Sequence, residues 1–308
     1  MSVGVGRDRI EAAASRIKGH VRTTPILDLG DVFNSGWSLS LKLDNLQPTG
    51  SFKVRGAFSL LTTLEPGTEV VAASGGNFAL AVARAGSGLE LAVTVFVPET
   101  SPAAKIARIR EEGAEVRVVA GYYDHALEAS REWASRTGAF EAHAYDDPEV
   151  VAGQGTLGLE VSGQRPGVDT VVVAVGGGGL IAGIASWFRG DVSVVGVESR
   201  GCRSFHAALT AGHPVDVEVS GVAASSLGAR SIGHHAWQAR EWIADSVLVE
   251  DADITAAQRW LWEEARIVAE PAAAVTVAAL RMDAFAPAWG ENVVAVISGG
   301  NVDPGSVA

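Results

Sequence analysis

One lysine and three glycine-rich turns are the parts of this sequence that could do chemistry. The lysine, Lys53, ends the segment Pro48-Thr49-Gly50-Ser51-Phe52-Lys53, and the turns are residues 74–78, 176–180 and 298–301. A neutral lysine amine attacks carbonyl carbons to form Schiff bases, and successive glycine N–H groups bind anions such as phosphate. Each segment alone has an ordinary explanation, since a lone lysine is usually solvated and glycine is common in turns. Their joint occurrence predicts a site that combines an amine nucleophile with an anion-binding loop.

The tetraglycine run, residues 176–179, lies between an apolar strand-like stretch and a helix-like stretch. This order directs backbone N–H groups and the positive end of a helix at one small volume, which suits a phosphate. A dinucleotide site is an alternative, because Gly177, Gly179 and Ala182 fit G-x-G-x-x-A and Glu198 follows Gly179 by 19 residues. A second match, residues 153–158, is poorer because no acid follows at the required distance.

The elements that must position these segments alternate between strands and helices. Such alternation predicts parallel sheets covered by helices on both faces, with ligands at the carboxyl ends of the strands. Ser101-Pro102 predicts a helix start, with Ser101 as N-cap, for a helix that ends at Gly113. The expected strands are Val70 to Ala73, Leu91 to Val97, Glu115 to Val119, Thr170 to Val175, Val192 to Glu198 and Val293 to Ile297.

The composition favours a small-molecule partner. The 308 residues carry 36 Asp and Glu against 24 Lys and Arg, a formal charge of -12, with no block of basic residues. Nucleic acids and anionic membranes are bound through clustered positive charge, so neither is expected as a partner. A single cysteine, Cys202, excludes internal disulfides and thiolate metal sites. The first residues lack the apolar segment of a signal peptide, which predicts a cytoplasmic protein.

Residues 170–188 form a stretch of 19 without a charge, close to the length that spans a bilayer. Four consecutive glycines lie inside it, and each costs about 1 kcal/mol in a helix interior. The stretch therefore predicts a buried strand, a loop and a helix start rather than a membrane span.

Other catalytic patterns are absent from the sequence. The seven histidines show no His-x-x-x-His spacing, and no Gly-x-Ser-x-Gly elbow occurs. His234-His235 is interpreted as a polar turn. Trp237 and Trp242 are candidates for a subunit contact, and a homodimer is expected.

The combined segments resemble the fold-type II pyridoxal-phosphate enzymes, and within them the serine/threonine dehydratase (ammonia-lyase) group. The resemblance implies a tryptophan synthase β-like α/β fold of two lobes, with parallel-rich twisted sheets covered by helices and the cofactor in the interlobe cleft. The large lobe would comprise residues 1–68 and 147–308, and the small lobe residues 69–146. No regulatory domain is expected after the Ser298 turn, since the chain stops at Ala308. The resemblance covers most of the chain and runs through Thr24-Pro25, Gly50-Ser51-Phe52-Lys53-Val54-Arg55-Gly56-Ala57, Ala152-Gly153-Gln154-Gly155-Thr156, Glu270-Pro271-Ala272 and Ser298-Gly299-Gly300-Asn301.

The resemblance also implies roles at matching positions. Lys53 would bind pyridoxal 5'-phosphate as a Schiff base and, once freed by substrate, remove the α-proton. The loop that binds the substrate carboxylate would be Ser74, Gly75, Gly76, Asn77 and Phe78, with the Ser74 hydroxyl as one ligand. The cofactor's ring would lie beside Phe52, its phenolic oxygen on Asn77, its phosphate on Gly176, Gly177, Gly178, Gly179 and Leu180, and its pyridine nitrogen on Ser298.

Several positions depart from that group. Phe78 replaces its usual histidine and Leu80 its next polar residue, so the pocket wall is expected to be more apolar. Relatives activated by a divalent cation pair a glutamate with an aspartate; here Glu198 is kept but Ser204 stands at the second position, so no metal is expected. Racemising relatives carry a serine where this chain has Gly75, which indicates elimination rather than racemisation.

The predicted function is PLP-dependent α,β-elimination of a β-hydroxy amino acid, such as L-threonine or L-serine, to a 2-oxo acid and ammonia. A neutral Ser298 at the pyridine nitrogen would weaken the ring as an electron sink, which favours prompt loss of the β-hydroxyl over transamination. The alternatives are β-replacement or racemisation of a related amino acid, an NAD-dependent dehydrogenase, and a catalytically silent binding protein.

Overall fold

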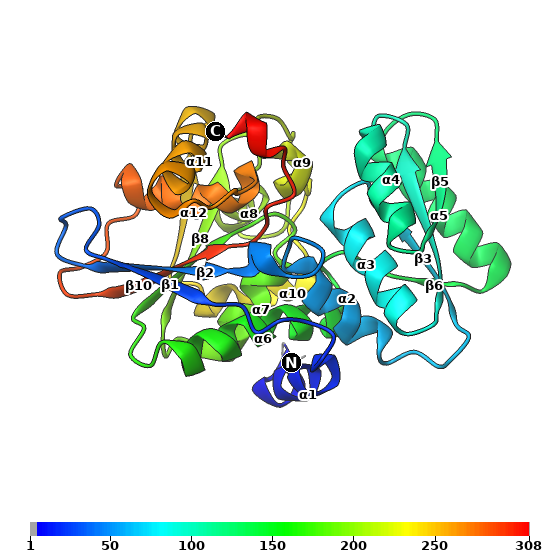
Figure 1. Ribbon diagram of the computed structural model, residues 1–308, viewed down its shortest axis with the longest axis horizontal. Helices are drawn as coiled ribbons and strands as arrows, with labels where there is room; N and C mark the ends of the chain where they lie inside the picture. Colours follow the sequence, from blue (N-terminus) through cyan, green and yellow to red (C-terminus); the bar gives the residue numbers. More distant parts are fainter. Residues whose placement is uncertain (1–4, 308) are drawn as a thin grey trace.

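Two separate sheets organise the protein in the computed structural model, which describes residues 5–307 (Figure 1). The larger sheet has six strands in the order β1-β2-β10-β7-β8-β9, and all of its pairs are parallel except β1 with β2. Its strands are β1 (Ile26–Gly30), β2 (Ser38–Leu43), β7 (Thr170–Ala174), β8 (Ser193–Ser199), β9 (Asp245–Val249) and β10 (Asn292–Ile297). Two predictions depend in part on residues outside the described range. The segment examined for a leader starts with residues 1–4. The expected absence of a regulatory domain rested on Ala308 as the last residue.

The smaller sheet has four parallel strands in the order β5-β4-β3-β6. Figure 1 shows this sheet and its helices grouped on one side of the molecule, with the larger sheet on the other. Its strands are β3 (Glu69–Ala73), β4 (Ala92–Pro98), β5 (Glu115–Val119) and β6 (Phe140–Glu141).

Helices cover both faces of each sheet. On the large sheet, α1, α6, α7, α8 and α10 contribute to one apolar cluster, and α11 and α12 contribute to the other. On the small sheet, α3 packs on one face and α5 on the other. The helices are α1 (Arg7–Ile17), α2 (Lys53–Leu61), α3 (Asn77–Gly88), α4 (Ala103–Glu111), α5 (Tyr123–Thr137), α6 (Pro148–Gln164), α7 (Gly179–Phe188), α8 (Ser204–Ala211), α9 (Ala224–Leu227), α10 (His234–Ala239), α11 (Asp251–Ala265) and α12 (Pro271–Arg281), with short 3-10 turns at Asp44–Leu46, Arg240–Trp242 and Pro304–Ser306.

Sequence features explain where these elements form. Every residue of β7, a Thr-Val-Val-Val-Ala run, is buried, as expected for a parallel strand with both faces covered. The α6 helix begins where the Asp147 carboxylate accepts hydrogen bonds from the Glu149 and Val150 N–H groups, with Pro148 in the first turn. Helix α2 joins the two halves of the molecule, because its apolar face lies in the same core cluster as α3 and β3.

The predicted fold class is confirmed, and the expected strands are present with ends shifted by one residue at most. The stretch at residues 170–188 is divided among β7, the tetraglycine loop and α7. In the described chain, no helix has the length and apolarity needed to cross a bilayer. The second G-x-G-x-x-G match lies inside α6, so it forms no ligand loop.

Two local predictions are wrong. Helix α4 begins at Ala103, and its N-cap is Pro102, whose backbone is extended (ψ 135°), rather than Ser101. The Ser101 hydroxyl does not cap the helix because it lies beside Gly75. His234 and His235 open helix α10 instead of forming a turn, because Gly233 serves as N-cap and Asp146 accepts from the His235 N–H at 3.0 Å.

Candidate active site

Lys53 is the first residue of α2, and the loop before it is joined to the turn after β10. The Phe52 N–H donates to the Ser298 carbonyl at 3.0 Å, and the Gly300 N–H donates to the Gly50 carbonyl at 2.9 Å. Gly50 has φ +74°, and a Cβ there would lie 2.4 Å from the Asn301 Oδ1, so only glycine fits this approach. The structure thus places two of the predicted segments, far apart in sequence, against each other.

The Lys53 side chain is half-buried, and its amine lies among aromatic rings. Its Nζ donates to the Ala144 carbonyl at 2.9 Å and lies 5.1 Å from the Phe52 ring centroid and 6.0 Å from that of Phe78. Burial lowers the Lys53 pKa to about 8, although the Glu270 charge acts in the opposite direction. A much larger fraction of this amine is neutral near pH 7 than in an exposed lysine, so Lys53 is suited to attack a carbonyl.

The predicted carboxylate loop follows directly after β3. Ser74 is anchored by its N–H to the Phe96 carbonyl at 3.1 Å, and its hydroxyl accepts from the Gly76 N–H at 3.3 Å. A Cβ on Gly75 would lie 2.3 Å from the Ser101 Oγ, so Ser101 occupies the space of a side chain at position 75. Phe78 and Leu80, the two departures from the resembled group, are both buried in the core of the small sheet.

The tetraglycine loop joins β7 to α7, and partners outside the loop hold two of its carbonyl groups. The Gly176 carbonyl accepts from the Ser204 hydroxyl at 2.9 Å, and the Gly177 carbonyl accepts from the Gly233 N–H at 3.0 Å. In a trans peptide the C=O and the following N–H point in opposite directions. The N–H groups of Gly177 and Gly178 are therefore turned away from these partners, as an anion-binding loop requires.

Tyr145 is a residue of this site that sequence reasoning missed. A Cβ on Gly177 would lie 2.4 Å from the Tyr145 ring, and one on Gly179 would lie 2.8 Å from the Tyr145 carbonyl oxygen. Tyr145 immediately follows Ala144, whose carbonyl accepts from Lys53. Burial raises the Tyr145 pKa, so its phenol stays protonated at neutral pH. No local pattern marks this residue, since its contacts with the tetraglycine loop come from a segment more than 30 residues away.

Glu270 is a second residue to which the sequence assigned no role. Its carboxylate accepts from the Asn77 Nδ2 at 2.7 Å and from the Ser226 hydroxyl at 3.4 Å. Burial raises its pKa, because the charged form loses its hydration. The available signal was an acid directly before the proline that opens α12.

Ser298 follows β10 and is buried, and its carbonyl receives the Phe52 N–H. The predicted site residues thus come from the carboxyl ends of β3, β7 and β10 and from the start of α2. Lys53, Phe52 and Ser298 are linked by the contacts described above. Asn77 joins them through Glu270, whose N–H donates to the Gly299 carbonyl at 3.1 Å. The hydrogen bonds do not link Ser74 directly to Lys53.

Three buried charges, Arg55, Asp44 and Lys42, and the half-buried Glu160 hold the first turn of α2 from the side opposite Lys53. The Arg55 guanidinium forms bidentate hydrogen bonds of 2.7–2.8 Å with Asp44 and of 2.7–2.9 Å with Glu160. The Lys42 ammonium, also fully buried, donates to Glu160 at 2.6 Å. Residues two apart on a helix point about 200° from each other, so Arg55 directs Lys53 away from this cluster.

Glu198 does not match the role of a ribose-binding acid. It is fully buried, and its two oxygens accept from the backbone N–H groups of Phe205 and His206 at 2.9 and 2.8 Å. Both oxygens thus bind groups inside the protein and neither reaches the surface, which argues against the dinucleotide alternative. Within residues 5–307, no group of three His, Cys, Asp or Glu side chains could hold a metal ion.

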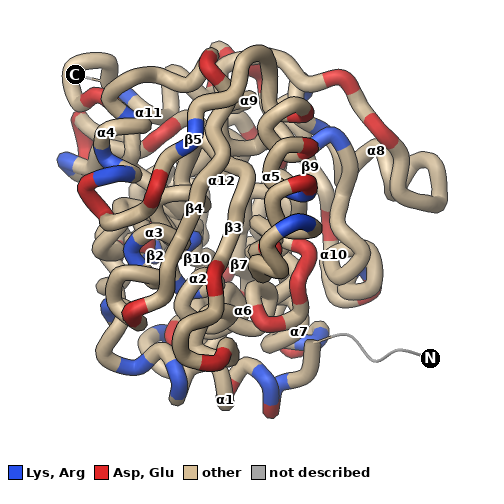
Figure 2. The backbone as a smooth tube through the Cα atoms, turned by 90° about the vertical axis from the view of Figure 1, so that its right-hand side faces the viewer, with Lys and Arg blue, Asp and Glu red and all other residues tan. Residues whose placement is uncertain are grey.

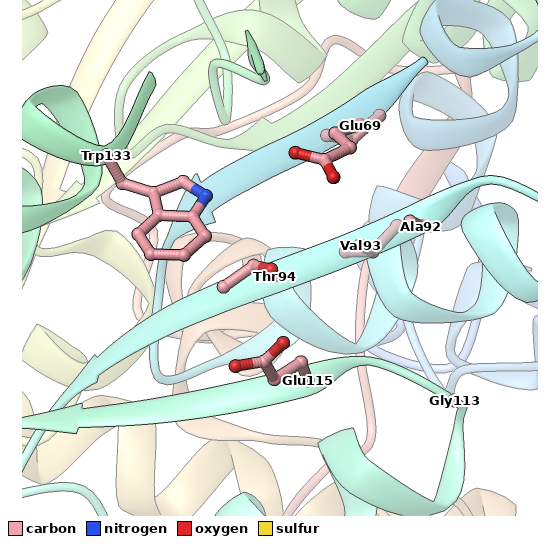
Figure 3. Close-up of a pocket in the computed structure, with 8 residues that line it drawn as sticks. Glu69, Ala92, Val93, Thr94, Gly113, Glu115 and Trp133 are labelled. Carbon is pink, nitrogen blue, oxygen red and sulfur yellow. The ribbon is translucent and has the colours of Figure 1, made fainter. Parts of the chain in front are cut away.

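Charge and cavities elsewhere do not define a competing site. Figure 2 shows acidic residues spread along the whole chain. A cavity of about 250 Å³ lies at the amino ends of β3, β4 and β5, the edge opposite to Ser74. Glu69, Thr94 and Glu115 project there beside the Trp133 ring (Figure 3), and none of the predicted site residues lines it.

Comparison with known proteins decides the family. Residues 17–299 match the family described as pyridoxal-phosphate dependent enzyme. The chain belongs to the pyridoxal-phosphate dependent enzymes. The L-threonine ammonia-lyase of Thermotoga maritima, a similar protein, is 38% identical over 278 residues, which cover 87% of this chain and 68% of that protein.

Solved structures of pyridoxal-phosphate dependent enzymes show the same fold. The processed form of threonine deaminase isoform 2 from Solanum lycopersicum has a TM-score of 0.89 at 30% identity, covering 99% of this chain and 93% of that chain. Maize serine racemase has a TM-score of 0.93 at 27% identity, covering 99% and 96%. The predicted family resemblance and cofactor are thereby confirmed.

The residues present fit pyridoxal phosphate. A half-buried lysine with a pKa of about 8 suits the aldehyde, and a glycine loop whose carbonyl groups are held outward suits the phosphate. The Phe52 ring beside Lys53 supplies an apolar surface for the flat cofactor ring.

Proposed function

We propose that this protein is a PLP-dependent lyase that removes water and ammonia from L-threonine or L-serine and yields a 2-oxo acid. The observation that carries the proposal is the buried Lys53 amine with its lowered pKa, at the start of a helix joined to the Ser298 turn. The name of the Thermotoga maritima relative, L-threonine ammonia-lyase, supports threonine as the first substrate to test.

The bound cofactor supplies an electron sink that makes the α-proton of an attached amino acid acidic. Lys53 would hold the cofactor and, once freed by substrate, would accept the α-proton at Nζ. Its lowered pKa of about 8 keeps a larger fraction of the amine neutral, and so able to accept a proton, near pH 7. Gly176, Gly177, Gly178, Gly179 and Leu180 bind the phosphate through their N–H groups. Phe52 packs against the ring.

Asn77 and Ser298 position the polar edge of the ring. The Asn77 Nδ2 has two hydrogens, of which one is given to Glu270, so the second is available to the phenolic oxygen. Ser298 is neutral and would leave the pyridine nitrogen largely unprotonated, which would favour elimination.

The substrate carboxylate binds the loop of Ser74, Gly75, Gly76, Asn77 and Phe78. The N-terminal end of α3, which begins at Asn77 and has no side-chain cap, adds favourable N–H groups for an anion there. Ser74 contributes its hydroxyl. Phe78 and Leu80 keep the neighbouring wall apolar and exclude water.

A panel assay tests this proposal. Purified protein loaded with pyridoxal phosphate is incubated with L-threonine, L-serine and other β-hydroxy amino acids, and the 2-oxo acid is measured. Lys53→Ala is expected to abolish the 2-oxo acid and the covalent adduct trapped by borohydride, whereas exposed Lys18→Ala keeps both. Trapping of the cofactor on Lys42 or Lys105 would overturn the assignment.

Three further features are proposed from the sequence. The small lobe, residues 69–146, carries the substrate loop, and the large lobe, residues 1–68 and 147–308, carries the cofactor; the separation of the two sheets supports this division.

The enzyme acts as a homodimer in the cytoplasm. Light scattering after size-exclusion chromatography tests the dimer, with a monomeric mass as the contrary result.

A further inference from the structure

Ser204 and Glu198 lie behind the tetraglycine loop, away from Lys53, and the proposed mechanism does not use them. Both are buried, with 1% and 0% of their surface exposed. Their hydrogen bonds go to the backbone of α8 and to the loop, and the Ser204 hydroxyl also lies close enough to the Glu198 carboxylate to lower its pKa. Burying a carboxylate is costly even when it is hydrogen-bonded, so a fully buried Glu198 that touches no proposed ligand calls for a structural role.

The contacts form a continuous chain from β8 to the loop. Glu198, near the end of β8, binds the Phe205 and His206 N–H groups with its two oxygens and so fixes the first turn of α8. Ser204 is the first residue of that turn, and its hydroxyl donates to the Gly176 carbonyl at 2.9 Å. A serine hydroxyl has one proton, and this one is used on Gly176.

The Gly176 carbonyl sets the direction of the Gly177 N–H, because both belong to one planar trans peptide. Gly176 is also confined from another side, since a Cβ there would lie 3.1 Å from the Leu227 Cα. A change in the Ser204 contact therefore rotates the Gly176–Gly177 peptide more readily than it moves the whole loop.

We propose that Ser204 is a positioning residue for the phosphate of the cofactor, and that Glu198 acts through it by fixing the start of α8. The Ser204 hydroxyl holds the Gly176 carbonyl outward, which turns the Gly177 N–H toward the phosphate. This inference rests on the proposed function, because it assigns the tetraglycine loop to the phosphate.

The test compares two ligands that share the aldehyde but differ in the phosphate. Cofactor-free protein is titrated with pyridoxal phosphate and with pyridoxal, and the adduct at Lys53 is followed by its visible absorbance. Ser204→Ala should weaken pyridoxal phosphate by about tenfold, the effect of one buried hydrogen bond, and pyridoxal by less than about twofold. Glu198→Gln should show the same selective loss. One oxygen of the carboxylate becomes an NH₂ group, which cannot accept the hydrogen bond from the backbone N–H that it faces, so the start of α8 is no longer fixed.

Ser199→Ala is the matched control. It removes another buried serine hydroxyl at the end of β8, but one that has no hydrogen-bond partner among the described residues. Both affinities of this variant should stay within about twofold of those of the unchanged protein. If Ser204→Ala weakens the binding of both ligands by the same factor, or of neither, the ratio of the two affinities does not change and the proposal is overturned.

Two further measurements keep the outcomes separate. If Ser204→Ala does not fold, Ser204→Cys tests the same contact, because a thiol is a weaker donor and should give a smaller selective loss. If the unchanged protein forms no adduct at Lys53, the proposed function fails. The loop is then tested directly by ³¹P NMR titration with inorganic phosphate, and equal binding by unchanged and Ser204→Ala proteins contradicts the positioning role.

Discussion

The amide of Asn77 donates to the buried carboxylate of Glu270 at 2.7 Å. This hydrogen bond links α3, which begins at Asn77 and packs on the small sheet, to Glu270, the residue just before α12 on the large sheet. The orientation of this amide follows from Asn301. The Asn301 Nδ2 donates to the Thr49 carbonyl at 2.8 Å, and its Oδ1 accepts from Arg108 at 3.0 Å. The Asn301 Nδ2 also donates to the Asn77 Oδ1 at 2.9 Å, so the Asn77 N–H₂ must face Glu270.

Attachment of the cofactor to cofactor-free protein should follow the titration of Lys53. Only the neutral amine attacks the aldehyde, so the rate rises with pH and levels off above the pKa of about 8. Below that pH the rate should change about tenfold per unit. Stopped-flow absorbance from about pH 6 to about pH 10 measures it, with a free lysine derivative, of pKa about 10.4, as the control. A midpoint equal to that of the free derivative would contradict the burial argument.

Glu270→Gln should move the midpoint of that profile to lower pH. The Glu270 charge raises the Lys53 pKa by favouring the ammonium, so its removal leaves the effect of burial less opposed. The same stopped-flow profile reports the shift. Glu263→Gln, an exposed change of equal charge on α11, should leave the midpoint in place. A rise in the midpoint of Glu270→Gln would show that its carboxylate is not the charge that Lys53 senses.

Gly75→Ser alone should not create a racemase. The added Cβ would lie 2.3 Å from the Ser101 Oγ, so the loop must shift or Ser101 must move. Gly75→Ser combined with Ser101→Gly removes that overlap and should yield D-serine from L-serine. Chiral chromatography after incubation in D₂O measures it. D-serine formed by the unchanged enzyme as fast as pyruvate would refute the assignment as an eliminating enzyme.

Asp44→Asn should destabilise the fold by about 3–5 kcal/mol, because it leaves the buried Arg55 with one anionic partner instead of two. Burial alone would raise the Asp44 pKa, but Arg55 outweighs it and the pKa is lowered. The stabilisation is therefore present above the ordinary carboxyl pKa and declines as the pH falls below about 4. Urea unfolding at several pH values measures both, with exposed Asp8→Asn expected within about 0.5 kcal/mol of the unchanged protein.

Local sequence patterns were sufficient for most of the fold. Strands β3, β4, β5, β7, β8 and β10 could be predicted because buried parallel strands are short β-branched runs bounded by glycine or proline. Strands β1, β2, β6 and β9 were missed. β2 is mostly buried but has no β-branched residue, β6 has only two residues, and only one residue of β9 and none of β1 is buried. The start of α4 was misjudged because a tertiary contact of Ser101 replaced the cap that its residue type favours.

The candidate site was only partly predictable for a related reason. Lys53 and the glycine turns have residue types whose chemistry is visible in isolation. Glu270, Tyr145 and Asn301 act through contacts with segments about 30 to 220 residues away, as between Asn77 and Asn301. No periodicity encodes such contacts.

The burial of Lys42 has a consequence for stoichiometry. The chain has four lysines, and Lys42 cannot react with an aldehyde while its amine is enclosed by Thr24, Glu160 and Gln164. Pyridoxal phosphate therefore has few amines other than Lys53 to modify, because Lys105 is half-buried and, of the remaining lysines, only Lys18 is exposed. Excess cofactor should load the protein to one equivalent per chain and leave its surface almost unmodified.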